Sequence, residues 1–132
     1  MARETEGIAL DLEVLRAGVA AVFEAPARGR YFVAETDGRV VGQLMVTYEW
    51  SDWRNANVWW IQSVYVWPEH RQAGVYRALY AHVQAEARSA GAAGLRLYVD
   101  RRNAAAQTVY ARLGMDGDHY LLFEHMFPGS PG

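Results

Sequence analysis

The sequence predicts one α/β domain over residues 1–132, in which a mixed, mainly antiparallel sheet carries helices on both faces. Residues 59–67 are apolar, aromatic and β-branched, which is typical of a largely buried strand, and Pro68 ends that strand. Apolar residues then recur at helical spacing from Val75. A further strand pattern follows at residues 95–99, and a strand–helix–strand order with a crossover of this length allows parallel pairing.

The first half of the chain predicts a helix followed by three strands. Helical spacing predicts a helix over residues 8–24 with Asp11 as its N-cap. Residues 31–36 and 39–49 predict two strands, and the Asp37-Gly38 pair between them is a strong hairpin signal because both turn positions can need positive φ. A polar and aromatic loop then leads to the strand at 58–66, so three successive antiparallel strands are the economical interpretation.

The second half predicts alternating helices and strands, with a loose tail at each end of the chain. The helix from Val75 ends in the Gly/Ala-rich break before the strand at 95–99. A loop at residues 100–103 precedes a short helix over 104–113, and Gly114 suits the C′ position of that helix. Residues 115–127 predict a last strand region. The tails are residues 1–7 and 128–132.

Composition excludes several classes of function. The net charge is −2 and the pI is near 6.1, so general nucleic-acid binding is not expected. The absence of cysteine excludes disulfides, thiolate metal sites and a cysteine nucleophile. No apolar run approaches the roughly 20 residues needed to span a bilayer, and no signal peptide is recognisable, so a cytoplasmic protein without a membrane partner is expected. The spacing of His82, His119 and His125 is not that of a metal site, and no metal is expected.

Residues 71–76 (Arg-Gln-Ala-Gly-Val-Tyr) lie between the strand and the helix and indicate a phosphate site. A glycine-bearing turn that opens a helix points backbone N–H groups outward, and the helix dipole adds positive potential. Arg71 adds a full charge. These features suit a phosphate or pyrophosphate, although an ordinary strand-to-helix turn is the alternative interpretation.

Two segments together resemble the GCN5-related N-acetyltransferases, the GNAT superfamily. Residues 64–76 (Val-Tyr-Val-Trp-Pro-Glu-His-Arg-Gln-Ala-Gly-Val-Tyr) resemble the strand and the R/Q-x-x-G-x-G/A pyrophosphate loop of that family. Residues 103–115 (Asn-Ala-Ala-Ala-Gln-Thr-Val-Tyr-Ala-Arg-Leu-Gly-Met) are similar to its N-x-x-A-x-x-x-Y-x-x-x-G-F segment. The resemblance covers about residues 31–126. It implies acetyl-CoA as the donor and an amine as the usual acceptor.

The chain departs from the family pattern at two places. Tyr76 stands where the family usually has Gly or Ala, so its side chain must point away from the pyrophosphate. Only about seven residues precede the first predicted helix, so we expect either that the first strand of the family is absent or that the chain is a truncated form. The sheet edge that this strand would cover then needs other protection, and we expect a partner chain, most simply in a homodimer.

The resemblance implies a cofactor role for the matched residues. The backbone of Val64 and Val66 would pair with the pantetheine arm, which requires the sheet to splay beside this strand, often with a bulge. The N–H groups of residues 72–76 would cradle the pyrophosphate. The expected cofactor-binding residues are Val64, Tyr65, Val66, Arg71, Gln72, Ala73, Gly74, Val75, Tyr76, Asn103, Ala106 and Tyr110.

Tyr110 and Glu49 are the expected catalytic residues. Tyr110 lies seven residues, or about two turns, after Asn103 and so shares its helix face. In the family this tyrosine sits near the thioester sulfur and protonates the departing thiolate; packing in the core is the alternative, and Asn103 can be simply an N-cap. Glu49 is the first choice for a base that deprotonates the acceptor ammonium. Asp52, Glu69, His70 and a chain of water molecules are the other candidates.

Five aromatic residues in the span 48–60 can serve either as walls of an acceptor pocket or as core and dimer interface. Strand alternation places Trp59, Ile61 and Ser63 on one face of the sheet. It places Trp60, Gln62 and Val64 on the other.

The sequence therefore predicts an N-acetyltransferase that moves an acetyl group from acetyl-CoA to a primary amine by direct attack. The acceptor can be a small amine or a protein amine. One alternative function is a non-catalytic acyl-CoA-binding module with a sensor or assembly role, and another is a structural homodimer with a vestigial groove.

Overall fold

The computed structural model describes residues 12–129. Contacts within the chain divide it into two units, one of residues 18–98 and one of residues 1–17 and 99–132.

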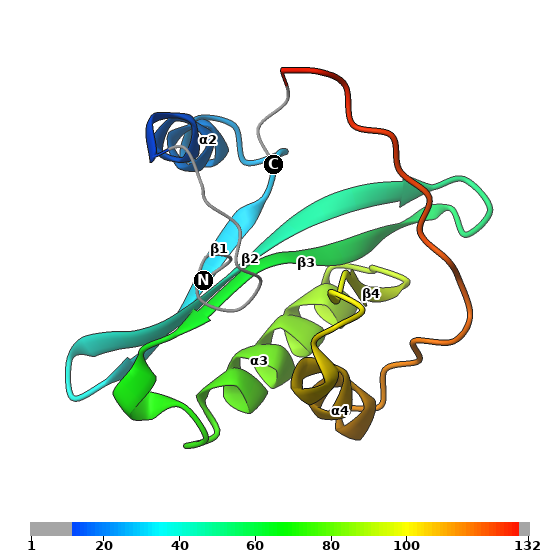
Figure 1. Cartoon of the computed structure of the whole chain (residues 1–132). Helices are drawn as coiled ribbons and strands as arrows, with labels where there is room; N and C mark the ends of the chain where they lie inside the picture. The colour runs from blue at the N-terminus through cyan, green and yellow to red at the C-terminus, as the bar shows by residue number, and fades with distance from the viewer. Residues whose placement is uncertain (1–11, 130–132) are drawn as a thin grey trace. The chain divides into compact units, whose positions relative to one another are not determined.

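The unit of residues 18–98 is built on a four-stranded sheet in the order β1-β2-β3-β4. The strands are β1 (Arg30–Thr36), β2 (Arg39–Ser51), β3 (Ala56–Val66) and β4 (Gly94–Leu97). The pairs β1–β2 and β2–β3 are antiparallel, whereas β3–β4 is parallel (Figure 1). The predicted mixed, mainly antiparallel sheet is therefore confirmed, and β2 and β3 are each longer than the sequence indicated.

The turn between β1 and β2 has the conformation that its sequence demands. Asp37 has φ 52° and Gly38 has φ 75°, so both central positions are left-handed. This is the backbone of the two-residue turns that join tightly twisted strands, and it confirms the predicted hairpin.

Helices lie on both faces of the sheet. Helix α3 (Val75–Ser89) buries one side against the sheet, and the ring of its His82 meets Phe32 of β1 edge-on at 5.6 Å. On the opposite face, Phe23 near the end of α2 (Leu12–Glu24) stacks on Tyr31 with ring centroids 5.4 Å apart. The predicted start of this helix at residues 8–11, with its N-cap Asp11, lies outside the described residues. None of the helices in the described part of the chain is long and apolar enough to cross a membrane.

The core of this unit lies between the sheet and α3. Leu44 and Val46 of β2 and Val83 of α3 are completely buried. Burial of such side chains stabilises the fold by roughly 1.5–3 kcal/mol each. The other buried hydrophobic residues are Phe32, Val41, Val58, Trp59, Ile61, Leu79, Tyr80 and Ala87.

Gly42 brings the first turn of α3 close to β2. A Cβ atom at this position would lie 2.8 Å from Cγ1 of Val75 and 3.4 Å from Cδ1 of Leu79. We therefore expect Gly42→Ala to destabilise the protein by ~1–3 kcal/mol through overpacking, measured by chemical denaturation. Gly18→Ala is the control, because a Cβ at this helical position meets no atom within 4 Å and alanine favours the helix. Equal stability of the Gly42→Ala variant and the parent would contradict the close approach.

A β-bulge at Gln62 changes which side chains of β3 share a face. Met45 of β2 pairs with Ser63 and Val46 pairs with Ile61, so Gln62 is the extra residue. The prediction that Ser63 shares a face with Ile61, and that Val64 lies on the other face, is therefore wrong. Val64 pairs with Leu44 and lies on the α3 face, because the inserted residue reverses the alternation.

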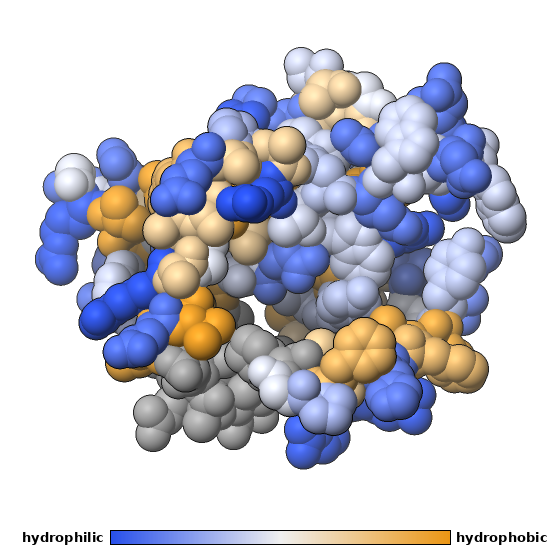
Figure 2. All heavy atoms as spheres, turned by 90° about the horizontal axis from the view of Figure 1, so that it is seen from above, coloured by the Kyte–Doolittle hydropathy of each residue, from blue (hydrophilic) through white to orange (hydrophobic). Residues whose placement is uncertain are grey.

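In the second unit, helix α4 (Ala104–Arg112) is followed by Gly114 with φ 91°, as the C′ position requires. The strand predicted at 115–127 is wrong, since residues 115–129 contain no strand. Asp118 N donates to Oδ1 of Asp116 at 2.8 Å in a local turn, and the described part of this unit offers no other strand as a partner. Side chains such as Phe123, 89% exposed, remain at the surface as a result. Hydrophobic groups lie beside hydrophilic ones on the surface in Figure 2.

Candidate functional site

The second half of β3 has an open edge. Strand β4 pairs with residues 58–61 of β3, and the last pair is Ile61 with Leu97. Strand β3 then continues to Val66, and within residues 12–129 this part of the strand pairs only with β2. The pairing of β3 with β4 therefore ends before Val64 and Val66, as the expected pairing with the pantetheine arm requires. A bulge, which often accompanies such an opening, lies at Gln62.

The bulge also decides which backbone groups face this open edge. The Asn57 carbonyl accepts from Ala93 N at 2.8 Å, on the β4 side of β3. Trp67 N donates to Val41 O at 2.9 Å, on the β2 side. A regular strand would turn residues 57 and 67 to the same neighbour, since they are an even number apart. Because the bulge reverses the pattern, the N–H and C=O groups of Val64 and Val66 face away from β2.

Arg71 holds the loop after β3 against this edge. Its Nε donates to Val66 O at 2.9 Å, and its guanidinium lies 5.4 Å from the centroid of the Tyr65 ring. Between Val66 and Arg71 the chain makes the 3₁₀ turn η1 (Pro68–His70). The positive charge of Arg71 is thereby fixed between the open edge and the start of α3.

The loop before α3 has the backbone of an anion cradle. Gln72 has φ 66° and Gly74 has φ 81°, so two left-handed residues flank Ala73, whose φ is negative. Such an alternation points successive backbone N–H groups toward one point. Ala78 N donates to Gly74 O at 3.0 Å, which begins the helical pattern and leaves the preceding N–H groups at the N-terminus of α3. The first turn of α3 contains Arg77 and no acidic residue, the reverse of the usual preference at a helix N-terminus. This polarity suits an anionic ligand.

The side chain of Tyr76 points toward the protein. Its ring centroid lies 6.4 Å from that of Tyr80 one helical turn later, and its hydroxyl is buried. The ring therefore lies along α3 near Tyr80, which agrees with the expectation that this side chain points away from a pyrophosphate in the loop.

In the second unit, one face of α4 carries the residues that the sequence singled out. Asn103, Ala106 and Tyr110 are half-buried, whereas the residues between them are exposed. Asn103 caps the helix, because its Oδ1 accepts from Ala106 N at 3.0 Å. The amide nitrogen of Asn103 is the group that it could offer to a ligand.

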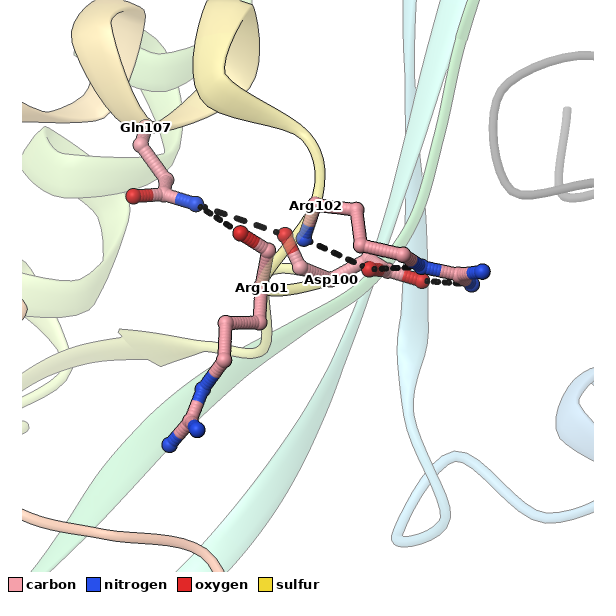
Figure 3. A network of polar contacts seen from close by, with 4 residues as sticks. All are labelled: Asp100, Arg101, Arg102 and Gln107. Carbon is pink, nitrogen blue, oxygen red and sulfur yellow. Dashed lines mark hydrogen bonds and ion pairs between the residues drawn. The ribbon is translucent and has the colours of Figure 1, made fainter.

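A network of polar contacts holds the loop before α4 (Figure 3). Asp100 makes a two-pronged ion pair with Arg102, Oδ1 to Nε at 3.0 Å and Oδ2 to NH2 at 2.8 Å. Gln107 Nε2 donates to the carbonyl of Arg101 at 2.9 Å, and the Arg101 side chain points away from the ion pair. These bonds fix the conformation of the loop at residues 100–102, directly before the N-cap Asn103.

The Asp100 carboxylate should titrate at unusually low pH. Hydrogen bonds from the Arg102 side chain and backbone lower the pKa of Asp100 from 3.8 to about 2. Because the folded-state pKa is lowered, the stabilisation from this pair is present above pH 3.8 and is lost as the pH falls through about 2. An NMR titration of the Asp100 carboxyl carbon should give a midpoint near 2. Arg102→Gln should return this midpoint toward 3.8, and equal midpoints would show that the ion pair does not form in solution.

Glu49 is held by two hydrogen bonds on the sheet face opposite α3. Its Oε1 accepts from Nε1 of Trp60 at 2.9 Å and from NH1 of Arg96 at 2.7 Å. The Trp60 bond, followed by Arg96, lowers the pKa of Glu49 in opposition to partial burial. Glu49, Trp60 and Arg96 are called the Glu49 cluster below.

The remaining candidate bases, and the aromatic residues other than Trp60, make other contacts. Glu69 and His70 line a cavity of about 160 Å³ beside Trp67, at the far end of β3. Asp52 accepts from Trp53 N at 2.9 Å in the β2–β3 turn, and the Trp53 side chain is 91% exposed. Tyr48 packs edge-on against the buried Trp59 with centroids 5.4 Å apart, so this pair belongs to the core.

The structure thus places the predicted residues in two groups. The open edge of β3, the loop before α3 and Glu49 belong to the unit of residues 18–98. Asn103, Ala106 and Tyr110 belong to α4 in the other unit. Sequence reasoning missed Arg96 and Gln62. Arg96 lay in a plain alternating strand, and two adjacent polar residues, Gln62 and Ser63, interrupted the apolar and aromatic residues of β3 without showing a bulge at Gln62.

A family model and a solved structure identify the family of the chain. Residues 4–115 match the model of the acetyltransferase (GNAT) family. A possible acetyltransferase from Clostridium difficile 630 is 41% identical, with a TM-score of 0.88, over 96% of this chain and 84% of that one. A probable acetyltransferase is 25% identical, with a TM-score of 0.80, over 97% and 85% of the two chains. An aminoglycoside N-acetyltransferase in complex with CoA, 22% identical over 88% and 90% with a TM-score of 0.69, shares the fold. No curated protein matches the sequence.

Proposed function

The chain belongs to the acetyltransferase (GNAT) family, and we propose that it transfers an acetyl group from acetyl-CoA to a primary amine by direct attack. One observation carries the proposal. The edge of β3 is open beyond Ile61, the bulge turns Val64 and Val66 toward it, and the loop before α3 follows within a few residues. A ligand with an extended amide-containing arm followed by a diphosphate would match this order: the arm would lie along the open edge, and the diphosphate would lie at the loop.

The residues present fit such a cofactor. Backbone groups of Val64 and Val66 can pair with the amides of the pantetheine arm, as an added strand would. Residues 72–76 can receive the pyrophosphate, because their left-handed positions and the N-terminus of α3 direct N–H groups outward. Asn103 and Ala106 are the α4 positions that we propose for the rest of the arm.

We propose that Tyr110 is the general acid of the reaction. When bound, acetyl-CoA supplies the acetyl group as a thioester; a C–N bond forms to the amine as the C–S bond breaks, and the sulfur leaves as a thiolate. The phenol of a tyrosine is protonated at neutral pH and can donate its proton or a hydrogen bond to that sulfur. Alignment of the amine with the thioester would supply most of the rate.

The acceptor ammonium must also lose a proton before it can attack. Glu49 was predicted as the base, and its side chain is 43% exposed on the face opposite α3. The lowered pKa of Glu49 reduces its affinity for a proton, which disfavours this role. Asp52, Glu69, His70 and water remain the other candidates. We also propose an amine of a small molecule or of a protein as the acceptor, and a homodimer as the assembly.

Two measurements in sequence test the proposal. Titration calorimetry should detect acetyl-CoA binding, and a panel of small amines and peptide N-termini should then release the free thiol with at least one member. Binding without thiol release from any amine would favour the non-catalytic acyl-CoA-binding module. Absence of binding to acetyl-CoA and to free CoA would overturn both functions and leave the structural homodimer.

A further inference from the structure

The Glu49 cluster links three strands at the place where the sheet begins to splay. Glu49 lies on β2, Trp60 on β3 and Arg96 on β4. Trp60 and Arg96 are opposite each other in the parallel ladder, one pair before its last pair, Ile61 with Leu97. The bulge at Gln62 follows two residues after Trp60. The carboxylate of Glu49 thus joins β2 to β4 across β3, directly before the open edge.

Two further contacts extend this link on both sides. The ring of Trp60 packs on Tyr98, the first residue after β4, with centroids 4.6 Å apart. Gln62 Nε2 donates to Oγ1 of Thr47 at 2.9 Å, which ties the bulge to β2. The first contact therefore fixes Tyr98, where the chain leaves β4, and the second fixes the bulge at Gln62.

From this arrangement we infer that Glu49 is a positioning residue, which sets the width and register of the open edge of β3 for the cofactor arm. The inference rests on the proposed function for the identity of that arm as the pantetheine of acetyl-CoA. It assigns to Glu49 a role through hydrogen-bond acceptance rather than through proton transfer. The Oε1 atom accepts both bonds, so a side chain that keeps an oxygen there keeps the link.

The charges around Glu49 agree with this role. Arg96 forms the ion pair with Glu49, and Arg54 also lowers the pKa of Glu49 through its charge. A carboxylate that is paired with one guanidinium group and feels the charge of a second is stabilised in its ionised form, so it accepts a proton poorly and a hydrogen bond well. Arg54 itself is held by Oγ of Ser51 at 3.2 Å.

Glu49→Gln and Glu49→Leu separate the two roles. Glutamine keeps an oxygen that accepts from Trp60 and Arg96, whereas leucine has a similar size and accepts from neither. We expect Glu49→Leu to weaken acetyl-CoA binding about tenfold by calorimetry, and Glu49→Gln to weaken it less than threefold. The pH midpoint of kcat/KM should be the same in Glu49→Gln and in the parent. Trp60→Phe, which removes one of the two donors, should fall between the two Glu49 variants.

The outcomes distinguish failure of this inference from failure of the proposed function. A Glu49→Gln variant that loses turnover as fully as Glu49→Leu, with unchanged acetyl-CoA affinity and a shifted pH midpoint, would overturn positioning in favour of a base. Unchanged acetyl-CoA affinity in Glu49→Leu would also overturn it. If Glu49→Leu does not fold, Trp60→Phe and Glu49→Gln give the same comparison. Absence of turnover in the parent would count against the proposed function, whereas the affinities would still test Glu49.

Discussion

Replacement of Tyr110 by phenylalanine is expected to lower kcat by about 10²–10⁴-fold while the dissociation constant for acetyl-CoA changes little. The variant removes one hydroxyl and keeps the aromatic ring of this half-buried residue of α4, so packing should be little changed. A hydroxyl that donates to the departing sulfur acts in the transition state, so its loss should appear in kcat rather than in cofactor binding. Thiol release with the best amine of the panel gives kcat, and calorimetry gives the affinity.

Tyr120→Phe is the matched control for this experiment. Tyr120 is 67% exposed and lies outside both motifs, so the same chemical change there should leave kcat as in the parent. An unchanged kcat in Tyr110→Phe would remove Tyr110 from the mechanism. A loss of affinity as large as the loss of kcat would instead assign the hydroxyl to cofactor binding.

The sequence predicted most of the fold because its local signals were strong. Asp37-Gly38 could form one kind of turn, and Pro68 had to end β3, since proline cannot donate to a ladder. Helix α3 begins at Val75 as expected, because apolar spacing and the Gly74 turn agree. Each of these signals depends on residues that are neighbours in the chain.

The predictions that failed depend on partners distant in the chain. The bulge at Gln62 follows from how β2 and β3 pair, and alternation along β3 alone gives the wrong face for Ser63 and Val64. The strand predicted at 115–127 had β-forming residues, but in the described residues no strand pairs with it, and β propensity is realised through such pairing.

In the candidate site too, the features that depend on neighbouring residues were predicted and those that depend on distant residues were not. The resemblance of the motifs led to the loop at 71–76 and to the cap at Asn103, both of which are local structures. The link from Glu49 to Arg96 joins residues 47 positions apart and left no local signal in the sequence. The hydrogen bonds of Glu49 favour a positioning role, which residues adjacent to it in the sequence do not indicate.

The substitution Val66→Pro should distinguish the pairing of the β3 backbone with the cofactor arm from its pairing with β2. Because the Val66 N–H faces the open edge, Val66→Pro removes a donor for the cofactor arm and leaves the ladder with β2 intact. An acceptor left unpaired in a bound ligand costs about 1–3 kcal/mol, so we expect acetyl-CoA affinity to fall roughly 5- to 150-fold. Calorimetry measures this affinity, and thermal unfolding checks that the fold is retained.

Two neighbouring variants make this prediction specific to the backbone. Val66→Ala keeps the N–H and should bind acetyl-CoA nearly as the parent does, so any loss shared by both variants would belong to the side chain. Tyr65→Pro removes an N–H that faces β2 and should destabilise the protein much more than Val66→Pro, since it breaks a ladder bond. If Val66→Pro instead unfolds the protein as Tyr65→Pro does, the backbone direction inferred from the bulge is wrong. If it folds and binds acetyl-CoA normally, the cofactor arm does not pair with this edge.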